Sequence, residues 1–393
     1  MRRLLPLLLL SAGATPVAEP APAPSRAVLA ADTEARWVPF DLTSGNQIRF
    51  RMTIDGRTVT AILDTGVSFS VIARSSPVLE GARVAGRSSV SAIGGAVEVG
   101  WMPVRSMSVG GLTRTGGGIG VAALPAAATG DASPVDLLIG SDLIGGQALE
   151  IDYAGRRFRL LRSGRLPFRG DAAPLRLSAE REVYETEITL GGRRLAPMVV
   201  DTGDGSAVTV TREGWATTVL ADRPTTTALA HGLAGPVVSD LAIVPDLAIG
   251  ALDAHEVEVR IESRGGFSRS IAVAGRIGSG LLQRYRVLLD PGAGRMVLAA
   301  TPLAAAPVQR STSGLLVGTL PDRLRVLHVM RGSPAEADGW QVGELICSID
   351  GRPVPADYAA SPLTGWSIAP PGHVVALGLC DGSVRRLTTR RFY

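Results

Sequence analysis

Two short acidic motifs lie within apolar stretches of the chain. Residues 60–72 read TAILDTGVSFSVI and residues 197–210 read PMVVDTGDGSAVTV, so Asp64 and Asp201 each lie between two apolar runs. A buried carboxylate is costly unless its charge is shared or hydrogen-bonded. Two carboxyl groups held close together share one proton, so that one is a base while the other is an acid. The pattern therefore favours general acid–base catalysis, in which one carboxylate deprotonates a water molecule and the other group protonates the carbonyl oxygen under attack.

The two acidic motifs belong to a longer internal repeat. Residues 48–66 (IRFRMTIDGRTVTAILDTG) and residues 184–203 (YETEITLGGRRLAPMVVDTG) each predict a strand, a two-residue turn and a second strand that ends at the acid. The tripeptide LIG ends 76 residues after the first acid, and RIG ends 77 residues after the second. The chain therefore carries two copies of one β-rich unit.

The elements expected around this repeat define an all-β protein. The 47 glycines and 26 prolines suit short strands joined by tight turns. We expect two lobes, residues 37–168 and 169–303, related by a pseudo-two-fold axis that brings the two acids together. Roughly thirty residues beyond each acid, glycines indicate hairpin tips, which are either flaps over the site or ordinary surface hairpins. The candidate flap residues are Gly94, Gly95 and Gly232.

Composition and motifs argue against several other classes of protein. All 40 basic residues are arginine, but 36 acidic residues leave a net charge of only +4, and the arginine doublets do not form one basic run. Nucleic-acid binding is therefore disfavoured. The four histidines have neither HxxxH nor HxxH spacing, and no GxSxG motif is present. We expect no metal, no cofactor and no serine hydrolase chemistry.

The N-terminal region predicts export. Residues 1–14 (MRRLLPLLLLSAGA) contain two arginines, an apolar run too short to span a bilayer and then small residues, which is typical of a signal peptide. Residues 15–36 are rich in Pro and Ala, which indicates an extended linker or a short N-terminal tail of the mature protein. No later run is long and apolar enough to cross a membrane. We expect a soluble mature protein that is periplasmic or extracellular.

The residues around both acids resemble those of pepsin-like and retroviral aspartic proteases, and in particular the bacterial retropepsin-like branch. The resemblance covers about residues 37–303 and rests on the two Asp-Thr-Gly triplets and the LIG and RIG steps. It implies a monomeric aspartic endopeptidase with both lobes in one chain, whose substrate is a protein or peptide. It also implies three pairs of site residues: Asp64 and Asp201 as the catalytic dyad, Thr65 and Thr202 as hydrogen-bond partners across the lobes, and Gly66 and Gly203 as backbone amides near the carboxylates.

Three residues depart from the pattern of that family. Val67 and Asp204 occupy the place after each triplet, which is usually small or hydroxylated, and Arg276 interrupts the apolar step of the second half. Asp204 either adds a third acid close to the dyad or points to solvent at the turn. An alternative function is therefore a catalytically weak or inactive protein that keeps the protease fold and binds peptides through its C-terminal part. An enzyme acting on a non-peptide amide or ester stays open but has no positive feature.

Residues 304–393 form a third unit of different character. The segment 324–354 (LRVLHVMRGSPAEADGWQVGELICSIDGRPV) resembles a PDZ domain, which implies a small α+β fold that binds a peptide C-terminus along an open sheet edge. The alternative is a PDZ-like domain that only packs on the lobes. The candidate peptide contacts lie near its start: Leu315, Leu316, Val317 and Gly318. Cys347 and Cys380 are either one disulfide or two small buried apolar side chains.

Overall fold

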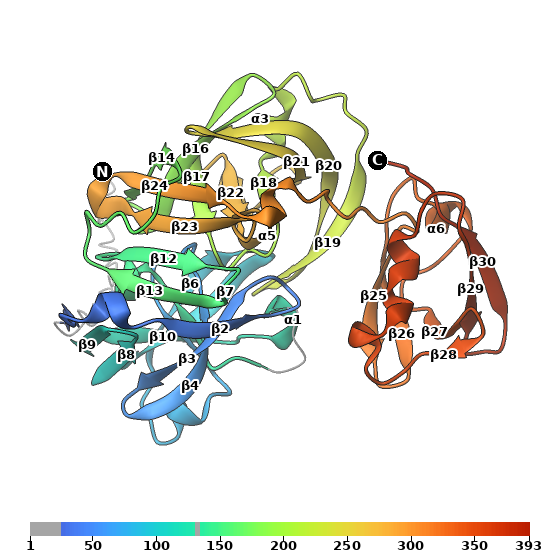
Figure 1. Cartoon of the computed structure of the whole chain (residues 1–393). Helices are drawn as coiled ribbons and strands as arrows, with labels where there is room; N and C mark the ends of the chain where they lie inside the picture. The colour runs from blue at the N-terminus through green and yellow to red at the C-terminus, as the bar shows by residue number, and fades with distance from the viewer. Residues whose placement is uncertain (1–24, 130–133) are drawn as a thin grey trace, which may run out of the picture.

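The computed structural model describes residues 25–129 and 134–393 and is mostly β (Figure 1). Its strands form sheets of 16, 8 and 6 strands, so the predicted all-β fold is confirmed. The predicted signal peptide, residues 1–14, lies outside the described residues. In the described part of the chain, no helix combines the length and the apolar character needed to cross a membrane.

The first half of the chain builds a strand arrangement that ends at the first acid. Strands β3 (Ile48–Ile54) and β4 (Arg57–Leu63) form a hairpin, and both turn residues, Asp55 and Gly56, have positive φ angles. A turn of this kind matches the right-handed twist of the flanking strands. Strand β4 also runs parallel to β11 (Leu137–Ile139), so the first acid emerges beside the LIG step.

The second half repeats this arrangement. Strands β16 (Tyr184–Leu190) and β17 (Arg193–Asp201) form a hairpin whose turn residues, Gly191 and Gly192, also have positive φ angles. Strand β17 runs parallel to β22 (Gly275–Gly278), just as β4 runs parallel to β11. The internal repeat in the sequence therefore corresponds to two equivalent strand arrangements.

The two halves share one sheet and one apolar core. Strand β12 (Ala148–Asp152) of the first half pairs antiparallel with β23 (Tyr285–Asp290) of the second. Strands β13 (Arg157–Leu161) and β24 (Arg295–Ala300) flank this pair. Apolar side chains from both halves belong to a single buried cluster. Because burial of this shared apolar surface stabilises only one arrangement, the two halves are fixed relative to each other.

Two hairpins, one from each half, meet at their tips. The backbone N–H of Ala234 in the second hairpin donates a hydrogen bond of 3.2 Å to the carbonyl of Ile93 in the first. Gly94, Gly95 and Gly232, the candidate flap residues, all lie at these tips. The four strands are β6 (Ala85–Ala92), β7 (Gly95–Pro103), β19 (Thr226–Gly232) and β20 (Gly235–Ile249).

The N-terminal segment differs from the predicted linker over residues 15–36. Strand β1 (Ser25–Leu29) pairs antiparallel with β9 (Leu112–Gly116), and the hydroxyl of Thr33 donates a hydrogen bond of 2.7 Å to the carbonyl of Leu160. The prediction of a linker is therefore wrong for residues 25–36. Composition indicated extended backbone correctly, but the strand that pairs with it lies far along the chain and leaves no local signal.

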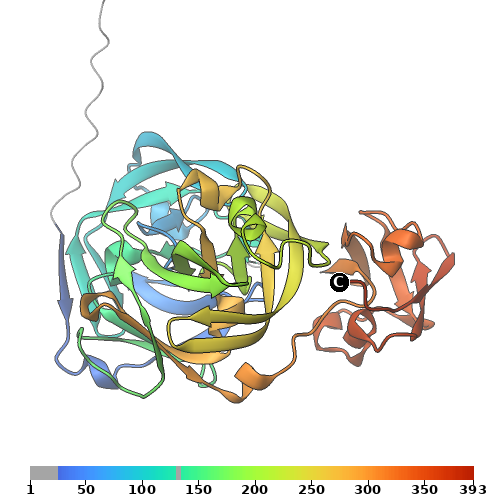
Figure 2. The same cartoon turned by 90° about the horizontal axis from the view of Figure 1, so that it is seen from above.

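The C-terminal unit forms a separate body beside the lobes, joined to them by the segment after β24 (Figure 2). Its apolar side chains form a cluster of their own. The unit contains the strands β25 (Leu315–Leu320), β26 (Arg323–Val329) and β27 (Leu345–Ile349) and the short helix α6 (Pro334–Ala337). The assignment as a PDZ-like domain and the domain boundaries drawn from the sequence stay predictions.

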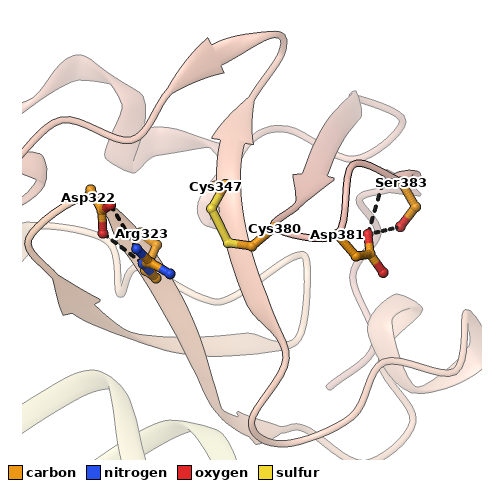
Figure 3. The surroundings of a disulfide bond; sticks show 6 residues. All are labelled: Asp322, Arg323, Cys347, Cys380, Asp381 and Ser383. Carbon is orange, nitrogen blue, oxygen red and sulfur yellow. Dashed lines mark hydrogen bonds and ion pairs between the residues drawn. A yellow bond between two sulfur atoms is a disulfide. The ribbon is translucent and has the colours of Figure 1, made fainter.

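The two cysteines, whose state the sequence leaves open, form a disulfide. Cys347 and Cys380 have Cα atoms 5.1 Å apart, and the bond joins β27 to the turn after β29 (Val374–Leu379) (Figure 3). In that turn, the carboxylate of Asp381 accepts hydrogen bonds from the backbone N–H and the hydroxyl of Ser383. The disulfide therefore links a central strand to a turn that is itself held by side-chain contacts.

Candidate active site

The two predicted catalytic acids lie together. Asp64 directly follows β4 and Asp201 ends β17, and the two carboxyl groups lie close enough for each to shift the pKa of the other. Asp201 is buried, whereas Asp64 is partly exposed. Each carboxylate accepts a 3.0 Å hydrogen bond from the backbone N–H two residues later, from Gly66 and Gly203 respectively. The fold thus joins two acids that are 137 residues apart in the chain.

Two threonines form hydrogen bonds between the halves next to the acids. The N–H of Thr65 donates to Oγ1 of Thr202 at 3.1 Å, and the N–H of Thr202 donates to Oγ1 of Thr65 at 3.0 Å. The hydroxyl of Thr65 donates to the carbonyl of Val200 at 2.6 Å, and that of Thr202 donates to the carbonyl of Leu63 at 2.7 Å. Both threonines are fully buried. These four satisfied hydrogen bonds hold the two acid loops in one relative position.

Gly66 and Gly203 are required because the two acid loops approach each other closely. A Cβ atom on Gly66 would overlap the carboxyl group of Asp201, and a Cβ atom on Gly203 would overlap that of Asp64. Neither glycine has a φ angle in the left-handed region. The requirement is therefore for space and not for a backbone conformation that only glycine adopts.

Burial makes both acids harder to ionise than isolated aspartates. It raises the pKa of Asp64 to about 6, although the amides of Gly66 and Val67 stabilise the charged form. Burial, followed by the charges of Asp64 and Asp204, raises the pKa of Asp201 well above its ordinary value. Because the two groups titrate as a pair, they hold one proton between them over an interval of pH. Within that interval the site contains both an acid and a base.

A cavity of about 640 Å³ lies between the second acid loop and the hairpin tips. Its walls include residues 203–206, the tips at residues 91–95 and the strand segment 229–231. Nε2 of Gln47 donates a hydrogen bond of 2.7 Å to the carbonyl of Gly203, so a turn of the first half also supports the second acid loop. No local pattern marks Gln47, and sequence analysis missed it. Within the described residues, no group of three His, Cys, Asp or Glu side chains is placed to hold a metal ion.

The residues that depart from the family pattern in the second half form a buried charged cluster. Nε of Arg276 donates to the carboxylate of Asp204 at 3.0 Å, and Nη1 donates to that of Glu262 at 2.8 Å. Nε of Arg276 also lies 3.8 Å from Oδ2 of Asp201. The exposed fractions of the Arg276, Asp204 and Glu262 side chains are 5%, 11% and 7%. Asp204 therefore does not point to solvent, and Glu262, which sequence analysis missed, completes its environment.

The candidate peptide contacts of the C-terminal unit lie on an edge strand. In the described sheet β25 pairs only with β26, so its other edge has no strand partner. Leu316 is 40% exposed, whereas Leu315 is buried. The backbone N–H groups of Gly314 and Leu315 already donate hydrogen bonds, to the hydroxyls of Ser311 and Ser313 respectively. Leu316 is therefore the most accessible of the predicted contacts.

Comparison with known proteins agrees with this geometry over the first half. Residues 50–143 match the family model described as aspartyl protease. The matched segment contains Asp64, the hairpin tip at Gly94 and Gly95, and the glycine of the LIG step. No curated protein matches the chain. The match over residues 50–143 supports a hydrolase, and the all-β fold agrees with it.

Proposed function

We propose that the protein is an aspartic endopeptidase. The observation that carries the proposal is the close approach of the Asp64 and Asp201 loops, held by the reciprocal hydrogen bonds of Thr65 and Thr202. With one proton on the pair, the ionised carboxylate removes a proton from water as the water oxygen bonds to the amide carbon. The protonated carboxyl gives its proton to the carbonyl oxygen. The resulting gem-diol then collapses: the nitrogen takes the proton that came from water as the C–N bond breaks, and one hydroxyl returns its proton to the other carboxylate, which restores a dyad with one proton.

The cavity and the hairpins favour an extended polypeptide as the substrate. An extended chain that lies beside hairpin strands forms backbone hydrogen bonds with them. The hairpin tips meet through the hydrogen bond between Ala234 and Ile93, so they separate to admit a chain. The predicted signal peptide at residues 1–14 adds that this substrate is an exported or extracytoplasmic protein.

Cleavage of an unstructured protein over a range of pH tests the proposed activity. The wild type is compared with Asp64→Asn and Asp201→Asn, and each change removes one member of the acid–base pair. We expect each variant to cleave at least about 100-fold more slowly than the wild type. Asp246→Asn makes the same chemical change at an acid that is 69% exposed and is expected to cleave like the wild type. A wild type that is folded but inert at every pH would contradict the proposal.

The open edge of β25 favours peptide capture as a second candidate function of the C-terminal unit. Its test is the binding of fluorescent peptides with free or amidated C-termini to the full chain carrying Asp64→Asn. We expect Leu316→Glu to weaken binding of free C-termini at least about tenfold, because it places a charge beside the incoming strand. Val384→Glu, at a position 63% exposed on another strand, is the control. Equal binding by both variants would contradict capture at β25.

A further inference from the structure

The charged cluster beside Asp201 breaks the symmetry of the two halves. In the aligned repeats, Val67 occupies the place of Asp204 after the triplet. Leu138, in the LIG step, occupies the place of Arg276 in the RIG step. The first half therefore has two apolar side chains where the second half has a buried ion pair.

The third member of the cluster, Glu262, also has an apolar counterpart. Glu262 follows the last residue of β21, which pairs in parallel with the last residue of β18. Ala123 follows the last residue of β10, which pairs in parallel with the last residue of β5. The cluster's charges therefore all lie on the Asp201 side of the dyad. These strands are β5 (Val71–Ala73), β10 (Gly118–Ala122), β18 (Val208–Val210) and β21 (Leu252–Ile261).

Within the cluster, Arg276 lies closer to Asp204 and Glu262 than to Asp201. The guanidinium is 3.0 Å from Asp204 and 2.8 Å from Glu262, but 3.8 Å from Asp201. Nη1 also donates to the hydroxyl of Ser268 at 2.8 Å. One positive and two negative side chains leave the cluster with one net negative charge. A negative environment around Asp201 disfavours a second negative charge on that residue.

Other titratable groups around the cluster do not cancel this asymmetry. Arg260 on β21 faces Asp204 but is itself paired with Glu258 at 3.4 Å. His231, on the hairpin strand β19, lines the same cavity with an exposed side chain. The neutral hydroxyl of Ser206 donates to Asp204 at 2.6 Å. Among the described residues, Asp204 is thus an acid outside the dyad whose charge acts on both dyad carboxyls.

We propose that the cluster of Asp204, Arg276 and Glu262 keeps the shared proton on Asp201 and the negative charge on Asp64. This inference rests on the proposed endopeptidase function, and it assigns Asp64 as the base that deprotonates water and Asp201 as the acid. The exposure of the two carboxyls acts in the same direction, because the neutral form is favoured at the more buried position. Arg276, Asp204 and Glu262 are thus positioning residues that act through Asp201.

The ionisation of the cluster residues agrees with this assignment. Burial alone would raise the pKa of Asp204, but Arg276 and the hydrogen bonds from Ser206 hold it below the ordinary value. Asp204 is therefore ionised wherever the dyad holds its single proton. Its charge is among the causes that raise the pKa of Asp201 and also among those that raise the pKa of Asp64, while Arg276 lowers that of Asp201.

The test is the pH profile of kcat/KM for two charge-changing variants. Asp204→Asn removes a negative charge, so we expect the alkaline limb to move to lower pH by about one pH unit. Arg276→Met removes the positive charge, so we expect that limb to move to higher pH by a similar amount. A purely structural role for the cluster would lower activity in both variants without moving their limbs in opposite directions.

Two further measurements keep the test decisive if a single variant unfolds. The first is the double variant Arg276→Met/Glu262→Gln, in which Asp204 is the one charged member of the cluster that remains. We expect its alkaline limb to move to higher pH, as for Arg276→Met alone. The second measurement compares Asp201→Asn with Asp64→Asn. An asparagine at the protonated position still donates a hydrogen bond to the carbonyl oxygen, whereas an asparagine at the base position removes the base. We therefore expect Asp201→Asn to retain at least about tenfold more activity than Asp64→Asn.

The outcomes separate this inference from the proposed function. An inert wild type contradicts the endopeptidase itself. An active wild type whose folded cluster variants shift in the same direction, or not at all, contradicts the assignment of the proton and leaves the endopeptidase standing. Asp246→Asn, the exposed-acid control, shows the size of shift that a remote charge produces.

Discussion

At the scale of single residues, the space around each carboxylate decides which side chains the acid loops accept. Gly66 and Gly203 each face the carboxyl group of the opposite half, with no room for a Cβ atom. The same closeness lets the two carboxyls share a proton. The absence of a side chain at these positions is therefore as necessary to the site as the presence of the acids.

Gly66→Ala tests this requirement. The added methyl group overlaps Asp201, so we expect cleavage to fall at least about 100-fold and the free energy of unfolding to fall by about 1–3 kcal/mol. Urea denaturation and peptide hydrolysis provide the two measurements. Gly146→Ala is the matched control, because a Cβ atom there has no neighbour within 4 Å. Wild-type activity in Gly66→Ala would show that the acid loops are less closely held than the structure indicates.

At the scale of elements, the two hairpins together line one side of the cavity. Their tips are joined by the backbone hydrogen bond from Ala234 to Ile93, and a Cβ atom on Gly232 would overlap the carbonyl of Ile93. Neither hairpin could make this contact alone. Access to the dyad therefore depends on how readily the two tips separate.

Linking the tips covalently tests that dependence. In the variant Ile93→Cys/Ala234→Cys we expect hydrolysis of a polypeptide to fall at least about tenfold under oxidising conditions and to recover on reduction. The control pair Val90→Cys/Val97→Cys lies at directly paired positions within one hairpin and leaves the tips free to separate. The wild type with reductant controls for loss of the disulfide between Cys347 and Cys380. Full activity of the cross-linked tips would rule out entry between them.

At the scale of the whole molecule, the C-terminal unit contacts the hairpin strand β19. The hydroxyl of Thr227 and Nε2 of His328 are 2.8 Å apart, and the N–H of Arg331 donates to the Thr227 hydroxyl at 3.1 Å. The guanidinium of Arg331 is 3.0 Å from the carboxylate of Asp240. The unit is therefore docked on the same strand that ends at a hairpin tip.

Acidification is expected to weaken this docking. Burial lowers the pKa of His328 below its ordinary value of 6.5, so the docked state binds fewer protons than the undocked state. Docking is then strongest above that ordinary value and weakens as the pH falls below it. Limited proteolysis of the joint at residues 301–314 measures this, and we expect cleavage to rise at least about threefold between pH 8 and 5.

Two variants define the contribution of each contact. Arg331→Ala is expected to raise cleavage of the joint at every pH, because the contact with Asp240 is lost. His328→Gln is expected to remove most of the pH dependence. His373→Gln, at an exposed position of the same unit, is the control. A wild type whose joint is cut equally at all pH values would contradict a role for His328 in docking.

Much of the fold and of the candidate site could be predicted because its signals are local or repeated. The turn at Asp55 and Gly56 depends on the dihedral preferences of two residues, and its equivalent in the second half depends on two glycines. The repeat then implied that Asp64 and Asp201 meet. The linker prediction failed for residues 25–29 because their pairing with β9 depends on a strand that is distant in sequence.

By itself, the amino-acid sequence determined the two β-rich repeats, their hairpins and the acids at their ends, because φ preferences and apolar alternation act between near neighbours. Only the tertiary structure decided that Cys347 and Cys380 are bonded and that Arg276 is held between Asp204 and Glu262. A buried charge is stable only beside a compensating charge or donor. The two partners of Arg276 lie just after different strands, Asp204 after β17 and Glu262 after β21. In the sequence, Arg276 is therefore visible only as an exception to an apolar step.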